Sequence, residues 1–192
     1  RDVIPFSTAF SANESAATFT TQPLPCRGYA VRTVRRIEVE ENRLTLYAEL
    51  TNTGDRTVIA AEYCHNFISI GGLPLSSAYC WESPQLNSPT TDPALPVQAT
   101  EHGFRFAETN RIAFAFRLDF LRPPELDWRL SNAIAGASVC AHESFMPDGI
   151  QIWSSGHMIC PEVFHNMQVA PGETHAWSRT YRFEQEKVIN TR

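Results

Sequence analysis

Two short segments of the chain combine ionisable side chains with strongly apolar neighbours. The first, residues 62–70, contains His65, and the second, residues 156–164, contains Glu162. Burying an ionisable group is costly unless it is paired, so each of these side chains needs a partner. A histidine and a carboxylate are the minimum for proton transfer, because imidazole titrates near neutrality and desolvation raises the pKa of a carboxyl toward it. The two segments therefore indicate general acid–base chemistry.

Each of the two residues also has a purely structural interpretation. His65 fits a neutral core histidine that is hydrogen-bonded to the backbone. Glu162 fits an ion pair with one of the arginines, and Pro161 stiffens the backbone just before it. Taken one at a time, the residues leave both interpretations open.

Other kinds of chemistry have less support. The chain has six histidines, but no two of them have the i, i+4 spacing of a helical zinc motif, and H-x-H does not occur. We expect no metal and no cofactor. The alternative is a metal site in a cupin-like barrel, formed by three histidines that converge in the fold. G-x-S-x-G is absent, and Cys64 and His65 are expected on opposite faces of a strand, which excludes a dyad.

The elements that must position these residues are strands. Period-two alternation of apolar residues is clearest in residues 111–121, 43–51 and 174–183. Further strands are expected at residues 29–39, 57–63, 66–70, 128–140, 150–153 and 164–169, with turn residues such as Asn52-Thr53-Gly54 between them. There is no internal repeat and no clear amphipathic helix. The pattern predicts an all-β protein, an antiparallel β-sandwich that forms a single domain over residues 1–192.

Residues 83–100 interrupt this series of strands. They hold four prolines among Ser, Thr, Asn and Asp, which is typical of a long irregular loop. A lid over a pocket and a simple insertion both fit this segment.

Charge and composition exclude several classes of partner. The 192 residues include 16 Lys plus Arg and 21 Asp plus Glu, a net charge of −5. No basic cluster is present for nucleic acid, and no apolar run is long enough to cross a bilayer. Five cysteines without C-x-x-C favour reduced thiols and a cytoplasmic location. No signal peptide is visible, although the chain begins with Arg1 and is interpreted as a trimmed or partial product.

The two segments and their surroundings resemble the aldose 1-epimerase, or galactose mutarotase-like, family. The resemblance lies in LTNTGDRTVIAAEYCHNFISIGG (residues 50–72) and HMICPEVFHNMQVAPGETHAWSRTYRFE (residues 157–184). The matching features, in order, are Asn52-Thr53-Gly54, His65-Asn66-Phe67, Pro161-Glu162, Pro171-Gly172-Glu173, and the last strand with Trp177, Tyr181 and Phe183. Their order and separation match over about residues 28–184.

The resemblance implies a β-supersandwich with a sugar cleft on its concave face and a mutarotase, an isomerase that interconverts the α and β anomers of a hexose. Glu162 would be the general base and His65 the general acid. Asn66 would bind the substrate, and Trp153, near the second segment, would stack on the sugar. No cofactor or metal is implied, and the partner is a small sugar.

The chain also departs from the family pattern. Family members are longer, and their N-terminal half supplies an arginine and a second histidine that bind substrate; residues 1–27 are too short to hold it. A fragment, a product of cleavage and a reduced homologue all fit, and a second chain or a second copy would then complete the sheet. The family's substrate-binding carboxylate has three candidates, Asp119, Asp127 and Asp148. The alternative functions are a non-catalytic carbohydrate-binding sandwich and a structural domain completed by a partner.

Overall fold

Every regular element of the described residues is a β-strand. The computed structural model describes residues 5–88, 94–107, 113–121 and 123–185. Its strands are β1 (Thr8–Ala12), β2 (Ala16–Thr21), β3 (Val31–Glu40), β4 (Arg43–Asn52), β5 (Val58–Glu62), β6 (Tyr79–Glu82), β7 (Leu86–Ser88), β8 (Val97–Ala99), β9 (Gly103–Phe106), β10 (Phe114–Phe120), β11 (Leu126–Asn132), β12 (Ala137–Glu143), β13 (Gly149–Ser155), β14 (Met158–Val169) and β15 (Thr174–Gln185). No helix capable of crossing a membrane occurs in this part of the chain.

The chain folds into two compact units. The first comprises residues 1–62 and 166–180, and the second comprises residues 63–165 and 181–192. Strands β14 and β15 each contribute to both units, because their bounds cross the limits of the units. The expectation of a single domain remains a prediction.

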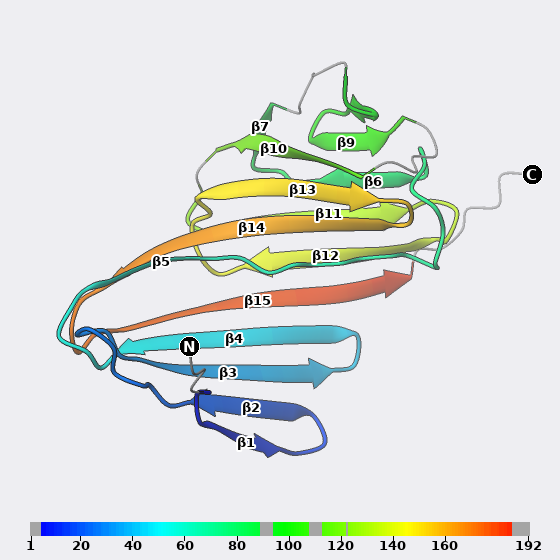
Figure 1. Ribbon diagram of the computed structural model, residues 1–192. Coiled ribbons are helices and arrows are strands. Elements are labelled where there is room, and N and C mark those ends of the chain that lie inside the picture. The colour runs from blue at the N-terminus through cyan, green and yellow to red at the C-terminus, as the bar shows by residue number, and fades with distance from the viewer. Residues whose placement is uncertain (1–4, 89–93, 108–112, 122, 186–192) are drawn as a thin grey trace, which may run out of the picture. The chain divides into compact units, whose positions relative to one another are not determined.

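The first unit is an antiparallel sheet in the order β1-β2-β3-β4, followed by the first part of β15 (Figure 1). The predicted Asn52-Thr53-Gly54 turn lies at the end of β4 in this unit. The side chain of Asn52 accepts a hydrogen bond from Gly54 N at 3.0 Å and donates to Val169 O at 2.9 Å. A Cβ at Gly54 would lie 2.5 Å from Gly28 O, so only glycine fits there.

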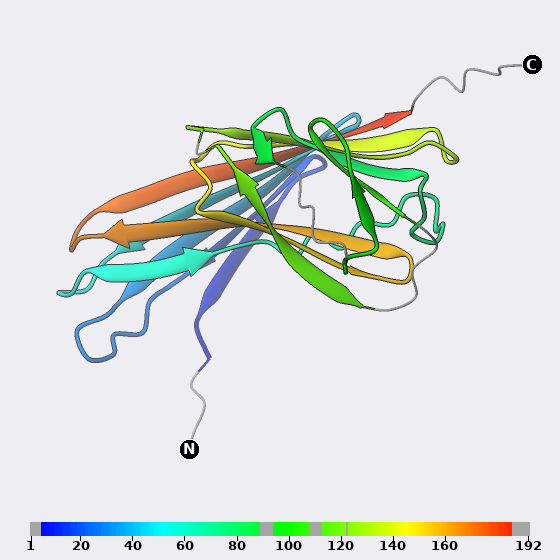
Figure 2. The same cartoon turned by 90° about the horizontal axis from the view of Figure 1, so that it is seen from above.

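The second unit is a sandwich of two antiparallel layers. One layer has the order β12-β11-β6-β9-β8 beside the end of β15, and the other has the order β14-β13-β10-β7. In Figure 2 the orange β14 lies in a different layer from the yellow-green β11 and β12. The layers pack through aromatic rings such as Phe104 and Phe116, whose centroids are 5.2 Å apart. The core contains fully buried residues from both layers, among them Trp81, Trp128, Leu130, Ile150 and Ile152.

The predicted all-β antiparallel sandwich is confirmed, and most predicted strands are present within a few residues of their expected bounds. The predicted strand at 66–70 is wrong, because only Ile68 forms an isolated bridge there, to Ile159. The predicted strand at 128–140 is two strands, β11 and β12. The side chain of Asn132 accepts from Ile134 N and Ala135 N, and Gly136 has a φ of 60°, which together make a turn.

The predicted irregular segment at 83–100 contains two short strands, β7 and β8, and residues 89–93 of it lie outside the described residues. Arg111 and Ile112, at the start of the predicted strand 111–121, also lie outside the described residues. The remainder of that strand is β10.

Candidate functional site

Strands β13 and β14 place a set of polar and aromatic side chains on one face. Their register pairs Gln151 with Glu162 and Trp153 with Cys160. Side chains alternate between the two faces of a strand, so these four residues share a face. The intervening residues, such as Ile152, have fully buried side chains and point into the core. The site is therefore built on the face of this layer opposite the core.

The carboxylate of Glu162 is buried, with 6% of the residue exposed, and contacts three side chains. Its Oε1 lies 3.3 Å from His65 Nε2. Its Oε2 accepts a hydrogen bond from Gln151 Nε2 at 3.0 Å, and Cys160 Sγ lies 3.7 Å from Oε1. The partner of Glu162 is thus the predicted histidine rather than an arginine.

His65 projects from residues 63–67, an irregular segment beside β14. Its side chain is 52% exposed, which argues against a core histidine. The ring packs edge-on against Tyr63, with centroids 5.0 Å apart, and lies 5.4 Å from the ring of Phe67. Two backbone hydrogen bonds between Ile68 and Ile159, at 2.9 and 3.0 Å, align the end of this segment with β14. An exposed imidazole beside a buried carboxylate is an arrangement that can move a proton to and from a bound molecule.

Asn66 is engaged by the protein itself. Its Nδ2 donates to Pro161 O at 2.9 Å, and its Oδ1 accepts from Tyr181 Oη at 2.8 Å. The Nδ2 end of the amide therefore holds the segment next to β14, which carries Glu162, and the Oδ1 end connects it to β15. A substrate-binding role for Asn66 stays a prediction.

Trp153 belongs to a belt of rings around the carboxylate. Its ring contacts Phe67 edge-on at 5.8 Å, and the belt continues through His65 and Tyr63 to Phe164, with the last two centroids 4.7 Å apart. Tyr63 and Phe67 are 42% and 56% exposed. Exposed aromatic faces beside a polar centre suit the CH-rich faces of a sugar ring.

Three residues of this site were not identified as site residues from the sequence. Gln151 and Cys160 contact Glu162, and Tyr63 packs against His65. One signal was available: Gln151 and Trp153 are two residues apart on a predicted strand, so they share a face. The register that places Gln151 opposite Glu162 is a tertiary property that the alternation pattern does not contain.

Burial keeps the thiol of Cys160 protonated. It is fully buried, and burial followed by the nearby Glu162 carboxylate raises its pKa to about 12. A protonated thiol is a hydrogen-bond donor, although a weak one. It therefore donates to Glu162 Oε1.

The candidate carboxylates for substrate binding do not join this site. Asp127 lies in the other layer, on β11, where its Oδ1 is 3.0 Å from His142 Nδ1. Asp119 is exposed on β10, and Asp148 lies just before β13. Neither contacts the carboxylate of Glu162.

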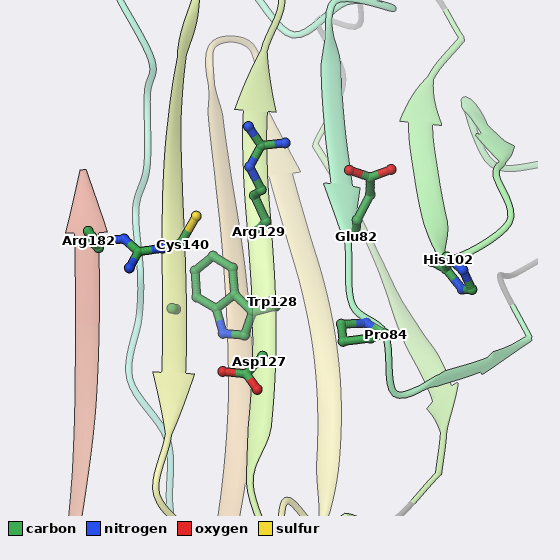
Figure 3. A pocket seen from close by; sticks show the side chains of 9 residues that line it. Glu82, Pro84, His102, Asp127, Trp128, Arg129, Cys140 and Arg182 are labelled. Atoms are coloured by element: carbon green, nitrogen blue, oxygen red, sulfur yellow. The ribbon is translucent and has the colours of Figure 1, made fainter. Parts of the chain in front are cut away.

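A hollow of about 440 Å³ lies on the outer side of that other layer (Figure 3). Asp127, Arg129 and Cys140 line it from the neighbouring strands β11 and β12, and Arg182 from β15. Of its lining residues, Arg182 forms an ion pair at 2.7 Å with Glu184, a residue outside the lining. It contains none of the predicted site residues. No group of three or more metal-binding side chains comes together in the described part of the chain.

Comparison with known proteins finds similar structures but no similar sequences. No family model and no curated protein matches the sequence. Among solved structures, a galactose mutarotase-like protein from Lactobacillus casei superposes with a TM-score of 0.69 at 16% identity, covering 93% of this chain and 73% of that one. A putative aldose 1-epimerase from Klebsiella pneumoniae gives 0.68 at 10% identity, covering 95% and 54%. A GalM/aldose epimerase homologue from C. elegans gives 0.66 at 11% identity, covering 95% and 69%.

These superpositions show a galactose mutarotase-like sandwich fold, which confirms the fold expected from the sequence motifs. They cover nearly all of this chain. The chain spans between 54% and 73% of the length of these proteins.

Proposed function

We propose that this chain acts as an aldose 1-epimerase-like enzyme on a hexose or a related sugar, interconverting its α and β anomers. The observation that supports this function most directly is the contact between His65 Nε2 and Glu162 Oε1, at 3.3 Å, within a ring of aromatic side chains. The names of the structural neighbours, which include a putative aldose 1-epimerase, point the same way.

In the proposed reaction Glu162 accepts the proton of the anomeric hydroxyl, while His65, as imidazolium, protonates the ring oxygen. The bond between the anomeric carbon and the ring oxygen breaks, and an open-chain aldehyde forms. After rotation of the aldehyde, the ring oxygen attacks its other face. His65 then takes back the proton from that oxygen as Glu162 returns one to the new hydroxyl, so both residues finish as they began.

The surroundings fit this reaction. Phe67 and Trp153 offer aromatic surfaces for the sugar ring, and Gln151 fixes the orientation of the base through Oε2. The free state of all five cysteines supports a reducing, cytoplasmic compartment. Exposed Phe10, Phe19, Ile37 and Val39 on β1–β3 support a second chain or a second copy against the first unit.

Replacing Glu162 with Gln tests the base. Two-dimensional exchange NMR on equilibrated glucose and galactose reports anomer exchange directly. We expect the wild-type chain to produce α–β cross-peaks and E162Q to lower the exchange rate by about 100-fold or more, the usual contribution of a general base. The matched control is Glu101→Gln, which alters an exposed His–Glu pair 3.6 Å apart on the outside of the molecule. Full activity in E162Q would remove Glu162 from the mechanism.

The alternative is a carbohydrate-binding sandwich without catalysis. The observation that favours it is the length of the chain, which is shorter than its structural neighbours. Titration calorimetry with the same sugars separates the two functions: binding without anomer exchange supports the binding protein, and exchange supports the enzyme.

A further inference from the structure

Cys160 is the buried group next to the site that the proposed reaction does not use. Its Sγ lies 3.7 Å from Glu162 Oε1, the same oxygen that His65 Nε2 approaches at 3.3 Å. The residue is fully buried, and it faces the same side of β14 as the carboxylate, two residues along the strand.

The backbone beside the thiol is also tied to the segment that bears His65. The side chain of Asn66 donates to Pro161 O at 2.9 Å, and Pro161 lies between Cys160 and Glu162 in the sequence. This hydrogen bond joins the two elements whose relative position sets the distance between His65 and Glu162.

We infer that Cys160 is a positioning residue: its thiol donates a hydrogen bond to Glu162 Oε1 and holds that oxygen toward His65 and the substrate. With Gln151 on Oε2 and the thiol on Oε1, both oxygens of the base are fixed before a sugar binds. This inference rests on the proposed function for its catalytic meaning, but its structural content stands on the contacts alone.

The polar and titratable groups around the carboxylate come from the neighbouring elements. The 63–67 segment presents His65, and its Cys64 lies within electrostatic reach of Cys160. The same strand presents the Cys160 thiol, and β13 presents the neutral amide of Gln151. Loss of the thiol therefore removes one of the three side-chain contacts of the carboxylate.

The experiment compares Cys160→Ala, which removes the donor, with Cys160→Ser, which keeps one. The matched control is Cys80→Ala, which removes another buried thiol that does not contact Glu162. We expect C160A to lower kcat for anomer exchange by about 10-fold with little change in KM. We expect C160S to restore most of kcat and C80A to leave it unchanged.

A second readout needs no catalysis. The 13C chemical shift of the Glu162 carboxyl carbon, measured at one fixed pH, is expected to differ between C160A and the wild-type chain, with C160S close to wild type. Equal chemical shifts in all three proteins would overturn the positioning role, as would a change in C160S as large as in C160A, the result of simple packing. A shift in C160A together with no anomer exchange in the wild-type chain would leave the positioning intact and count against the proposed enzyme.

If C160A fails to fold, the wild-type thiol itself is measured. Raman spectroscopy reports the S–H stretch, which moves to higher wavenumber when a hydrogen bond to an acceptor is lost. We expect this shift on Glu162→Ala, and an unchanged S–H band would overturn the inference.

Discussion

At the scale of single residues, Asn66 shows how one amide joins separate parts of the second unit. It contacts the carbonyl of Pro161, directly before the proposed base, and the hydroxyl of Tyr181 on β15. Since Asn66 follows His65 in the chain, these contacts limit where the imidazole can lie. In the structure, Asn66 therefore holds His65 beside Glu162.

Tyr181→Phe tests this role of Asn66. The change removes the 2.8 Å hydrogen bond to Oδ1 but keeps the ring, which packs edge-on against Trp128 with centroids 6.2 Å apart. We expect the free energy of unfolding to be about 1 kcal/mol lower than in the wild type and KM for a sugar to stay within twofold. Urea denaturation and anomer exchange measure the two quantities. The control is Tyr47→Phe at an exposed tyrosine.

Asn66→Ala is the companion variant. We expect it to lower the free energy of unfolding by about 2 kcal/mol, because the Pro161 carbonyl also loses its hydrogen-bond donor. A Tyr181→Phe variant of normal stability with weakened sugar binding would instead show that Asn66 contacts the sugar.

At the scale of elements, the 63–67 segment is irregular and yet aligned with β14. Its alignment depends on the two backbone hydrogen bonds of the Ile68–Ile159 bridge. Irregular segments held at a few points suit functional side chains, because a rigid scaffold positions them while the segment adapts to a ligand. The Ile68–Ile159 bridge therefore sets how far His65 lies from Glu162.

Ile68→Pro is expected to release this segment. Proline has no N–H, so the 2.9 Å bond from Ile68 N to Ile159 O is lost. We expect the amides of residues 64–67 to exchange hydrogen faster and anomer exchange to fall at least 10-fold, while β11 and β12 keep their protection. Hydrogen-exchange mass spectrometry checks the first effect. Ile68→Val, which keeps the N–H, is the control, and unchanged exchange in the proline variant would contradict the importance of the bridge.

Strands with strict alternation could be predicted from the sequence, and the failures have physical causes. Residues 43–51 and 174–183 alternate and form β4 and β15. Residues 66–70 also contain apolar side chains at Ile68 and Ile70, but Asn66 uses its amide to bond Pro161 and Tyr181, and only Ile68 forms a β-bridge. Residues 133–135 look apolar enough for a strand, whereas the Asn132 side chain caps two backbone amides and turns the chain.

The candidate site was predictable only in part. His65 and Glu162 were identified by their residue types in apolar surroundings, and the structure brings them together. Gln151 and Cys160 were not identified, because neutral polar residues in strands are common and only the register with β14 gives them a partner. Residue types pointed to His65 and Glu162, whereas strand pairing places Gln151 and Cys160 beside Glu162.

At the scale of the whole molecule, the second unit buries two thiols that stay protonated. Cys80 is 2% exposed, and burial followed by Glu82 raises its pKa from 9.0 to about 11. Cys160 is fully buried, with its pKa raised to about 12. Unfolding exposes both thiols to water, where they ionise at lower pH. The folded chain binds their protons more tightly than the unfolded chain does.

This difference predicts a loss of stability in alkaline solution. Because the folded pKa is raised, the stabilisation is fully present below pH 9 and is lost as the pH rises toward 11. We expect the free energy of unfolding, measured with urea under reducing conditions, to fall between pH 8 and pH 10.5, with about 1–2 kcal/mol of the fall due to Cys80. Cys80→Ala is expected to flatten the fall by that amount, whereas Cys26→Ala, at an exposed thiol, leaves it unchanged. If the free energy of unfolding falls with pH equally in the wild type and in Cys80→Ala, this thiol ionises in the folded chain as readily as in the unfolded one. Water would then reach the thiol through the sheet.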